Sequence, residues 1–190
     1  MKIFLSPLEI KALYFLAAKR SLRDECILRV MGNTGLRVSD ARTILVSDVA
    51  SDNGEIYSSL RKKMKKTGKY IERSLNEATR DALKRYLPIV QGKSVYLFPG
   101  SNQKQPISRG YCHKLFKILL KQLMPQETDL RAASTHTLRR SVGFMISENC
   151  NIETAAEFLG HSNIGSTTSY LSKEVLKRKS DEFLRKDMNF

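Results

Sequence analysis

Cysteine is scarce in this chain, and the few that occur are widely separated. They stand at Cys26, Cys112 and Cys150, so no pair has C-x-x-C spacing or the spacing of metal ligands. An odd number without a paired pattern argues against a disulfide framework. We therefore expect three buried, reduced thiols in a protein of the cytosol, and no metal site.

Long apolar runs are missing as well. The apolar residues near the N-terminus are interrupted by Pro7, Glu9 and Lys11, which leaves no uninterrupted signal-peptide core. No stretch is long enough to cross a membrane as a helix, and no internal repeat or low-complexity segment occurs. These absences predict a globular protein that works in the cytoplasm, where it is made, without a membrane partner.

Negative charge is in short supply. The 190 residues include 33 Lys and Arg against 19 Asp and Glu, which gives a formal net charge of +14. Such an excess favours a polyanionic partner, and nucleic acid is the common one. Ribosomal proteins and proteins that bind anionic membranes share this excess. The net charge therefore indicates a polyanionic partner but does not identify which one.

Helical periodicity runs through most of the sequence. Ser6, Pro7 and Glu9 have the pattern of a helix start. The apolar face expected for that helix consists of Leu8, Ala12, Leu13, Phe15 and Leu16. Further helices are expected at residues 22–32, 38–45, 77–87, 108–123, 138–149, 152–159 and 174–185.

The period changes between residues 48 and 75. Residues 56–64 and 70–75 are predicted to be strands, and residues 66–69 are predicted to form the turn of a hairpin between them. The expected fold class is therefore α+β: mainly α with a small antiparallel β-sheet.

Four motifs follow one another in an order that suggests chemistry. The first is TGLRVSD at residues 34–40, and the second is Lys66 in the basic hairpin. The third is HTLR at residues 136–139. The fourth is LGH at residues 159–161, with Tyr170 nine residues after the histidine.

Together these residue types match the needs of an attack on a phosphodiester. The transition state gathers negative charge on its non-bridging oxygens, and two guanidiniums can hold those oxygens at every working pH. A tyrosine hydroxyl can form a covalent intermediate with phosphorus. A lysine can deliver a proton to the departing oxygen, and histidines can bind a phosphate oxygen or relay a proton near neutral pH.

The motifs resemble those of the tyrosine recombinases, also called the phage integrase family, from about Leu5 to Phe190. The resemblance implies a recombinase catalytic domain that uses neither metal nor ATP. It assigns Arg37 and Arg139 to a phosphate clamp and Lys66 to the general acid. It makes Tyr170 the nucleophile, which would leave a 3′-phosphotyrosyl link to DNA.

The same resemblance makes His136 and His161 a supporting pair for acid/base chemistry and hydrogen bonding. Two positions depart from the family pattern. Asp40 stands where Glu is usual, and either carboxylate can anchor a neighbouring backbone or Arg. Arg140 stands where a His is common, and we expect it to add a phosphate contact.

The basic hairpin has several candidates for each role. Its neighbouring lysines leave alternatives to Lys66 as the acid, and a solvated basic turn is the plain structural interpretation. We also expect contacts to the DNA backbone without sequence preference. The predicted DNA-binding residues are Arg61, Lys62, Lys63, Lys65, Lys69 and Arg140.

In length the chain resembles the short fimbrial phase-variation invertases, with no room for the N-terminal clamp domain of most family members. Residues 1–172 are expected to form the catalytic domain, and residues 173–190 a helical tail that is exchanged between protomers. The expected partners are double-stranded DNA at the nucleoid and further copies of the chain, as a tetramer on paired sites and a monomer without DNA. Accessory DNA-binding proteins are further candidates.

Two alternatives stay open beside site-specific recombination. A type IB topoisomerase has similar active-site chemistry and relaxes DNA as a monomer. A DNA-binding regulator could keep a recombinase fold without catalysis, although pure binding does not require Tyr170.

Overall fold

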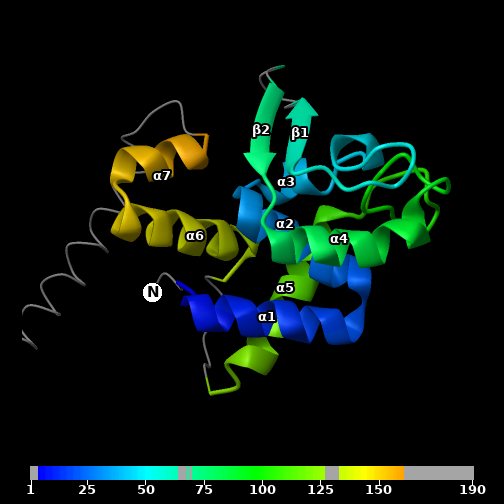
Figure 1. Cartoon of the computed structure of the whole chain (residues 1–190). Coiled ribbons are helices and arrows are strands. Elements are labelled where there is room, and N and C mark those ends of the chain that lie inside the picture. The colour runs from blue at the N-terminus through cyan, green and yellow to red at the C-terminus, as the bar shows by residue number, and fades with distance from the viewer. Residues whose placement is uncertain (1–3, 64–67, 69, 127–132, 161–190) are drawn as a thin grey trace, which may run out of the picture. The chain divides into compact units, whose positions relative to one another are not determined.

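The computed structural model describes residues 4–63, 68, 70–126 and 133–160 (Figure 1). The chain divides into two compact units, Met1–Arg139 and Arg140–Phe190, and each is considered by itself. Helices dominate the described residues of both units, and the sheet in the described part of the chain is a two-stranded antiparallel hairpin. The predicted α+β class is confirmed.

The first helix, α1 (Pro7–Arg20), starts where the sequence predicts. The Ser6 hydroxyl accepts the Glu9 amide, and the Glu9 carboxylate accepts the Ser6 amide at 2.7 Å. This reciprocal cap satisfies donors that have no partner inside the helix, and Pro7 has no amide hydrogen to leave unsatisfied.

The buried face of α1 differs from the predicted one. Ile10, Leu13 and Ala17 are buried, whereas Leu8 is 79% exposed and Phe15 is 60% exposed. The predicted face placed Leu8 and Phe15 inward because both are large and apolar. Only the direction in which the neighbouring helices pack decides which stripe of a mostly apolar helix is covered.

Helix α2 (Leu22–Thr34) lies in the centre of the first unit and packs against α1 (Figure 1). A Cβ at Gly32 would stand 1.8 Å from the Tyr14 hydroxyl of α1, so any side chain here would displace the Tyr14 ring. Helix α2 ends at Gly35, whose φ of 64° is left-handed and favours glycine.

The helix that follows Gly35 is shorter than predicted. The expected helix over residues 38–45 is α3 (Val38–Ala41), and a 3₁₀ turn, η1 (Val46–Asp48), follows it. Leu97 donates its amide to Ile44 O at 2.8 Å. This pairing draws the chain into an extended conformation at the point where the helix was expected to continue.

Strands β1 (Ser59–Lys63) and β2 (Tyr70–Ser74) form the predicted hairpin, with Lys63 opposite Tyr70. The first strand starts later than expected because Ile56 instead makes an isolated bridge to Ala50. Side chains of successive residues point to opposite faces of a strand. In β1 that alternation buries Leu60 and Lys62, while Arg61 and Lys63 are exposed.

Two amphipathic helices complete the first unit: α4 (Glu77–Val90), which packs against α2, and α5 (Arg109–Leu123), which packs against α1. Each begins at a capping side chain, Asn76 for α4 and Ser108 for α5. The largest fully buried side chains of this unit are Leu13, Ile27, Leu28, Met31, Ile44, Leu60, Leu83, Leu97, Phe98, Phe116, Leu119 and Leu120.

Helix α6 (Thr135–Asn149) begins in the first unit and continues into the second, which also contains α7 (Ile152–Phe158). Within the second unit a Cβ at Gly143 would lie 2.7 Å from a Leu159 methyl carbon, so these two residues are in close contact. The helix expected at residues 174–185 lies outside the described residues.

Two further expectations can be compared with this fold. Cys26 and Cys112 are buried and free as predicted, but Cys150 is exposed, because it lies at the end of α6, where few residues cover it. Among the described residues, no helix is both long and apolar enough to span a membrane.

Candidate active site

The segment that carries Arg37 is shaped by its backbone. Gly35 turns the chain with a φ of 64°, and Arg37 follows in an extended conformation as the N-cap of α3. The Arg37 carbonyl accepts the amides of Asp40 and Ala41, both at 2.9 Å. The half-buried Arg37 therefore sits on a short, internally bonded turn rather than in the middle of a helix.

Arg139 reaches this same segment from 104 residues further along the chain. One of its guanidinium nitrogens donates a hydrogen bond to the Gly35 carbonyl. The Arg139 side chain is 7% exposed, so a carbonyl partner offsets part of the cost of burying its charge. The structure thus brings Arg139 next to the turn that ends in Arg37.

His136 lies in the first turn of α6, three residues before Arg139, and it is exposed. Residues three apart share a face of a helix. The helix begins at Thr135, earlier than the predicted residue 138, so both His136 and Arg139 of the HTLR motif are helical. The His136 amide is held by the Ser134 hydroxyl at 3.3 Å.

Several predicted site residues lie outside the described part of the chain. They are Lys65, Lys66, Lys69, His161 and Tyr170. Arg140 belongs to the second unit and is half-buried. In the described residues, no group of histidine, cysteine and carboxylate side chains could hold a metal ion.

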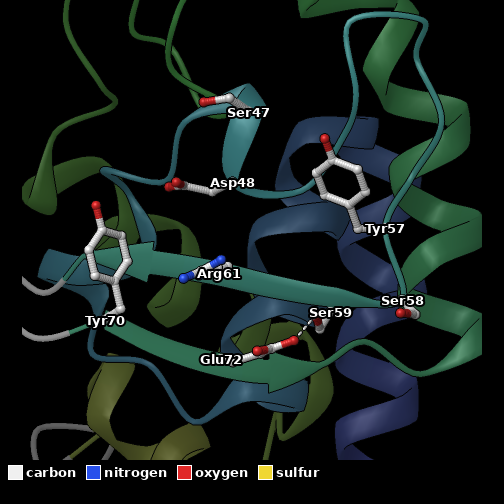
Figure 2. Close-up of a pocket in the computed structure, with 8 residues that line it drawn as sticks. All are labelled: Ser47, Asp48, Tyr57, Ser58, Ser59, Arg61, Tyr70 and Glu72. Atoms are coloured by element: carbon white, nitrogen blue, oxygen red, sulfur yellow. Dashed lines mark hydrogen bonds between the residues drawn. The ribbon is translucent and has the colours of Figure 1, made fainter.

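A pocket of about 760 Å³ lies against the outer face of the hairpin (Figure 2). The strands and the chain segment before them both contribute to its walls. It is lined by Ser47, Asp48, Tyr57, Ser58, Ser59, Arg61, Tyr70 and Glu72.

The exposed basic residues on this outer face are organised around one aromatic ring. The Arg61 guanidinium lies 5.4 Å from the centre of the Tyr70 ring, and Lys63 Nζ lies 5.9 Å from it. Across the strands, the Ser59 hydroxyl donates to the Glu72 carboxylate at 2.6 Å (Figure 2). A cation near an aromatic face is attracted to the ring, which restrains these side chains while they stay in contact with solvent.

Lys62 occupies the opposite, inner face of the hairpin. It is 6% exposed, and its ammonium donates to the Thr43 carbonyl at 2.7 Å and lies 3.8 Å from the Asp48 carboxylate. Burial lowers the pKa of Lys62, and the nearby Asp48 and Asp40 carboxylates oppose that shift. Sequence reasoning grouped Lys62 with the DNA-binding lysines, whereas the structure engages it inside the protein.

Asn33 contributes to this region, and no sequence motif singled it out. Its amide nitrogen donates to the Ser74 carbonyl at 3.1 Å, and its amide oxygen accepts the Asn76 amide at 2.7 Å. It therefore binds the backbone at the end of β2. Its position directly before the TGLR motif was the one hint that the sequence offered.

Comparison with known proteins agrees with this arrangement. Residues 4–176 match the model of the phage integrase family. Tyrosine recombinase XerC of Neisseria meningitidis (serogroup C / serotype 2a) is 30% identical over 173 residues, which cover 85% of this chain and 52% of that protein. The chain thus spans about half the length of the curated relatives it matches.

Solved structures show the same fold. XerA recombinase has a TM-score of 0.73 and 24% identity, with 94% of this chain and 65% of that chain covered. XerH recombinase bound to a palindromic difH substrate has a TM-score of 0.75 and 16% identity, with 95% and 52% covered. The resemblance seen in the motifs is confirmed across nearly the whole chain, which belongs to the phage integrase family.

Proposed function

We propose that this chain is the catalytic domain of a site-specific DNA recombinase, which breaks and rejoins DNA through a 3′-phosphotyrosyl intermediate. One observation carries the proposal beyond family membership. Arg139, distant in sequence, donates to the carbonyl of Gly35, two residues before Arg37. The two arginines that the chemistry requires are therefore held by a direct contact between their segments.

Arg37 and Arg139 form the phosphate clamp in this proposal. Each guanidinium stays charged at any working pH and can offer paired N–H donors to two phosphate oxygens. Arg139 uses one guanidinium nitrogen to hold the Gly35 carbonyl, and a guanidinium carries five N–H donors in all. A partly buried setting strengthens the attraction for the charge that develops on the transferring phosphoryl group.

The remaining roles follow the family pattern. The Tyr170 oxygen bonds to phosphorus, and the bond between phosphorus and the 5′ oxygen breaks. Lys66 gives a proton to that 5′ oxygen, while His136 and His161 bind phosphate oxygens and take up the tyrosine proton. The reverse attack by a DNA 5′ hydroxyl restores the phosphodiester. The phosphotyrosyl bond keeps the bond energy, so no metal or nucleotide cofactor is needed.

Contacts to the DNA backbone come from basic residues of the hairpin and from Arg140. The proposed set is Arg61, Lys63, Lys65, Lys69 and Arg140. Lys62 is left out of it, because its ammonium is buried against Thr43 and Asp48. Backbone contacts position a protein on DNA without reading its sequence, so they predict binding that weakens steeply as salt rises.

The assembly proposed is a tetramer on two paired DNA sites, with the chain monomeric in the absence of DNA. Residues 1–172 act as the catalytic domain, and residues 173–190 as a tail that packs on a neighbouring protomer. Accessory DNA-binding proteins supply further site recognition, and the protein works at the nucleoid in the cytoplasm. A solved complex of XerH recombinase with its difH substrate supports double-stranded DNA as the partner.

Capture of the covalent intermediate tests the proposal. Wild-type protein incubated with nicked duplexes from its own genetic element should form a complex that resists denaturant. Tyr170→Phe should abolish that complex and leave DNA affinity nearly unchanged, because only the hydroxyl is removed. Tyr57→Phe, which changes an exposed tyrosine in the same way, should keep full capture.

The other outcomes point to the alternative functions. Binding without a covalent complex in the wild type would indicate a DNA-binding regulator. Relaxation of a supercoiled plasmid that lacks any recombination site would indicate a topoisomerase. Capture that persists in Tyr170→Phe would place the nucleophile at another residue.

A further inference from the structure

The hairpin is attached to the Arg37 segment through two side chains: Asn33 binds the main chain at the open end of β2, and Lys62 belongs to β1 near the turn. On the β2 side, Asn33 holds the Ser74 carbonyl at 3.1 Å and the Asn76 amide at 2.7 Å. Asn33 itself lies at the end of α2, four residues before Arg37. Both polar groups of the amide are thus committed to the main chain that leaves the hairpin.

On the β1 side, Lys62 makes the equivalent attachment to the far end of the same segment. Its ammonium donates to the Thr43 carbonyl at 2.7 Å, just beyond α3. Asp48, 3.8 Å from that ammonium, is fixed in turn because it accepts the Leu45 amide at 2.9 Å. The lysine is 6% exposed, so its charge is committed to this inner contact.

The two attachments bracket Arg37. Asn33 precedes it and Thr43 follows it, and the Arg139 guanidinium binds Gly35 in between. Two side chains from distant parts of the chain, Lys62 and Arg139, therefore bind residues 33–48, and Asn33 of this segment binds the end of β2. A hairpin held at one strand could pivot about that contact, whereas attachment at both strands resists rotation relative to Arg37.

We propose that Asn33 and Lys62 are positioning residues, which fix the hairpin relative to Arg37 and so align proton delivery with the clamped phosphate. This inference rests on the proposed function, in which a hairpin lysine protonates the leaving 5′ oxygen. Small errors in the placement of reacting groups are costly, since a shift of about 1 Å can slow a reaction on the order of 100-fold.

Two substitutions remove the attachments with little change of shape. Lys62→Met keeps the aliphatic stem and removes the ammonium. Asn33→Asp keeps the oxygen that accepts Asn76 but places a second oxygen against the Ser74 carbonyl, where a donor is required. The matched controls are Lys84→Met and Asn53→Asp, because Lys84 and Asn53 are both exposed and lie outside the hairpin and its two attachments.

The decisive measurement compares two DNA substrates under single-turnover conditions, well below the unfolding midpoint of each variant. One has a normal phosphodiester at the cleavage site, and the other has sulfur in place of the bridging 5′ oxygen. A thiolate leaves without a proton, so the second substrate bypasses the acid. Each variant should lose about 10-fold or more on the normal substrate. Most of that loss should disappear on the sulfur substrate, and both controls should match the wild type.

Each other result overturns the inference. An equal loss on both substrates would mean that the substitutions damage the clamp or the fold as a whole, and full activity on the normal substrate would mean that the attachments do not matter. Asn33 is half-buried and Lys62 is buried, so either substitution can destabilise the fold. If one variant unfolds, the other still tests the inference. Failure of the proposed function looks different, because wild-type protein would then capture neither substrate.

Discussion

The two faces of the hairpin use the same kind of residue for opposite purposes. On the outer face, Arg61 and Lys63 lie near the Tyr70 ring and remain exposed. On the inner face, Lys62 is buried against a carbonyl and a carboxylate. Three consecutive basic residues are therefore divided by the alternation of a single strand.

A second buried cation has the same character as Lys62. Arg139 is 7% exposed and also donates to a main-chain carbonyl, that of Gly35. We call Lys62 and Arg139 the inner cations, and Arg61 and Lys63 the outer cations. The inner cations have fixed directions and fixed partners, whereas the outer cations offer charge to any nearby polyanion. Basic composition alone does not distinguish the two groups.

The largest effect is expected at an inner cation. Arg139→Lys should lower the rate of covalent capture by about 100-fold or more, because lysine keeps the charge but loses the planar fork. Single-turnover cleavage at saturating DNA measures this loss. Arg109→Lys, at an exposed position on α5, is the control and should cleave at the wild-type rate. If Arg139→Lys cleaved DNA at the wild-type rate, only the positive charge of Arg139 would matter and not the geometry of its guanidinium.

Next in size is the effect of changing the partner of Arg139. Gly35→Ala should lower the free energy of unfolding by about 1–2 kcal/mol, because alanine is strained at a left-handed φ. Urea titration measures the change. In Gly110→Ala the new methyl would meet only the Ser108 hydroxyl at 3.8 Å, so this variant should not be destabilised. Equal stability of the two variants would show that the turn before Arg37 tolerates a side chain.

A smaller effect is expected at the outer cations, and it should appear in DNA affinity. Arg61→Ala or Lys63→Ala should each reduce the slope of log affinity against log salt by about 1, because one phosphate contact is lost. The free energy of unfolding should change by less than about 0.5 kcal/mol, as for other surface substitutions. Binding isotherms at several salt concentrations give the slope. An equal change of slope in Lys62→Met would mean that the inner face contributes to DNA binding as much as the outer face does.

The smallest effect concerns pH. Burial lowers the pKa of Lys62 below its ordinary 10.5, against the opposing effect of Asp48. Between the lowered value and 10.5 the unfolded chain binds more protons, so rising pH should favour the folded state. The stability of wild type relative to Lys62→Met should therefore increase as pH rises toward 10.5.

Equilibrium unfolding of both proteins at matched pH values tests this sign. Burial also raises the pKa of Tyr14 and Cys26 to about 12 each, which destabilises the fold at high pH, but both proteins share that effect. Lys84→Met, at an exposed lysine, should track the wild type throughout. A difference that shrinks with pH would mean that Lys62 is stabilised by its ion pair more than it is penalised by burial.

Helix starts were the most predictable part of the fold. Ser6 with Glu9, and Ser108, provide local caps that need no distant partner, and their helices begin where expected. Other helix boundaries differ from the predicted ones because residues distant in sequence bind the main chain there. The helix expected through residue 45 ends at Ala41, where Leu97 pairs with Ile44.

The candidate site divides in the same way. Arg37, His136 and Arg139 could be found from motif spacing, because each motif is short and local. Asn33 could not, because its role depends on the main chain of Ser74 and Asn76, more than forty residues later. The burial of Lys62 could not be predicted for a related reason: a basic run does not show which side of its strand is covered.

The sequence by itself determined the family, the order of the motifs, the helical character and the excess of positive charge, since all of these are local patterns or sums over residues. Only the tertiary structure decided which cations face inward, which stripe of α1 is buried and how Arg139 meets the Arg37 segment. Those outcomes depend on which surfaces are desolvated when distant elements pack, and a buried charge is tolerated only where that packing also supplies its partner.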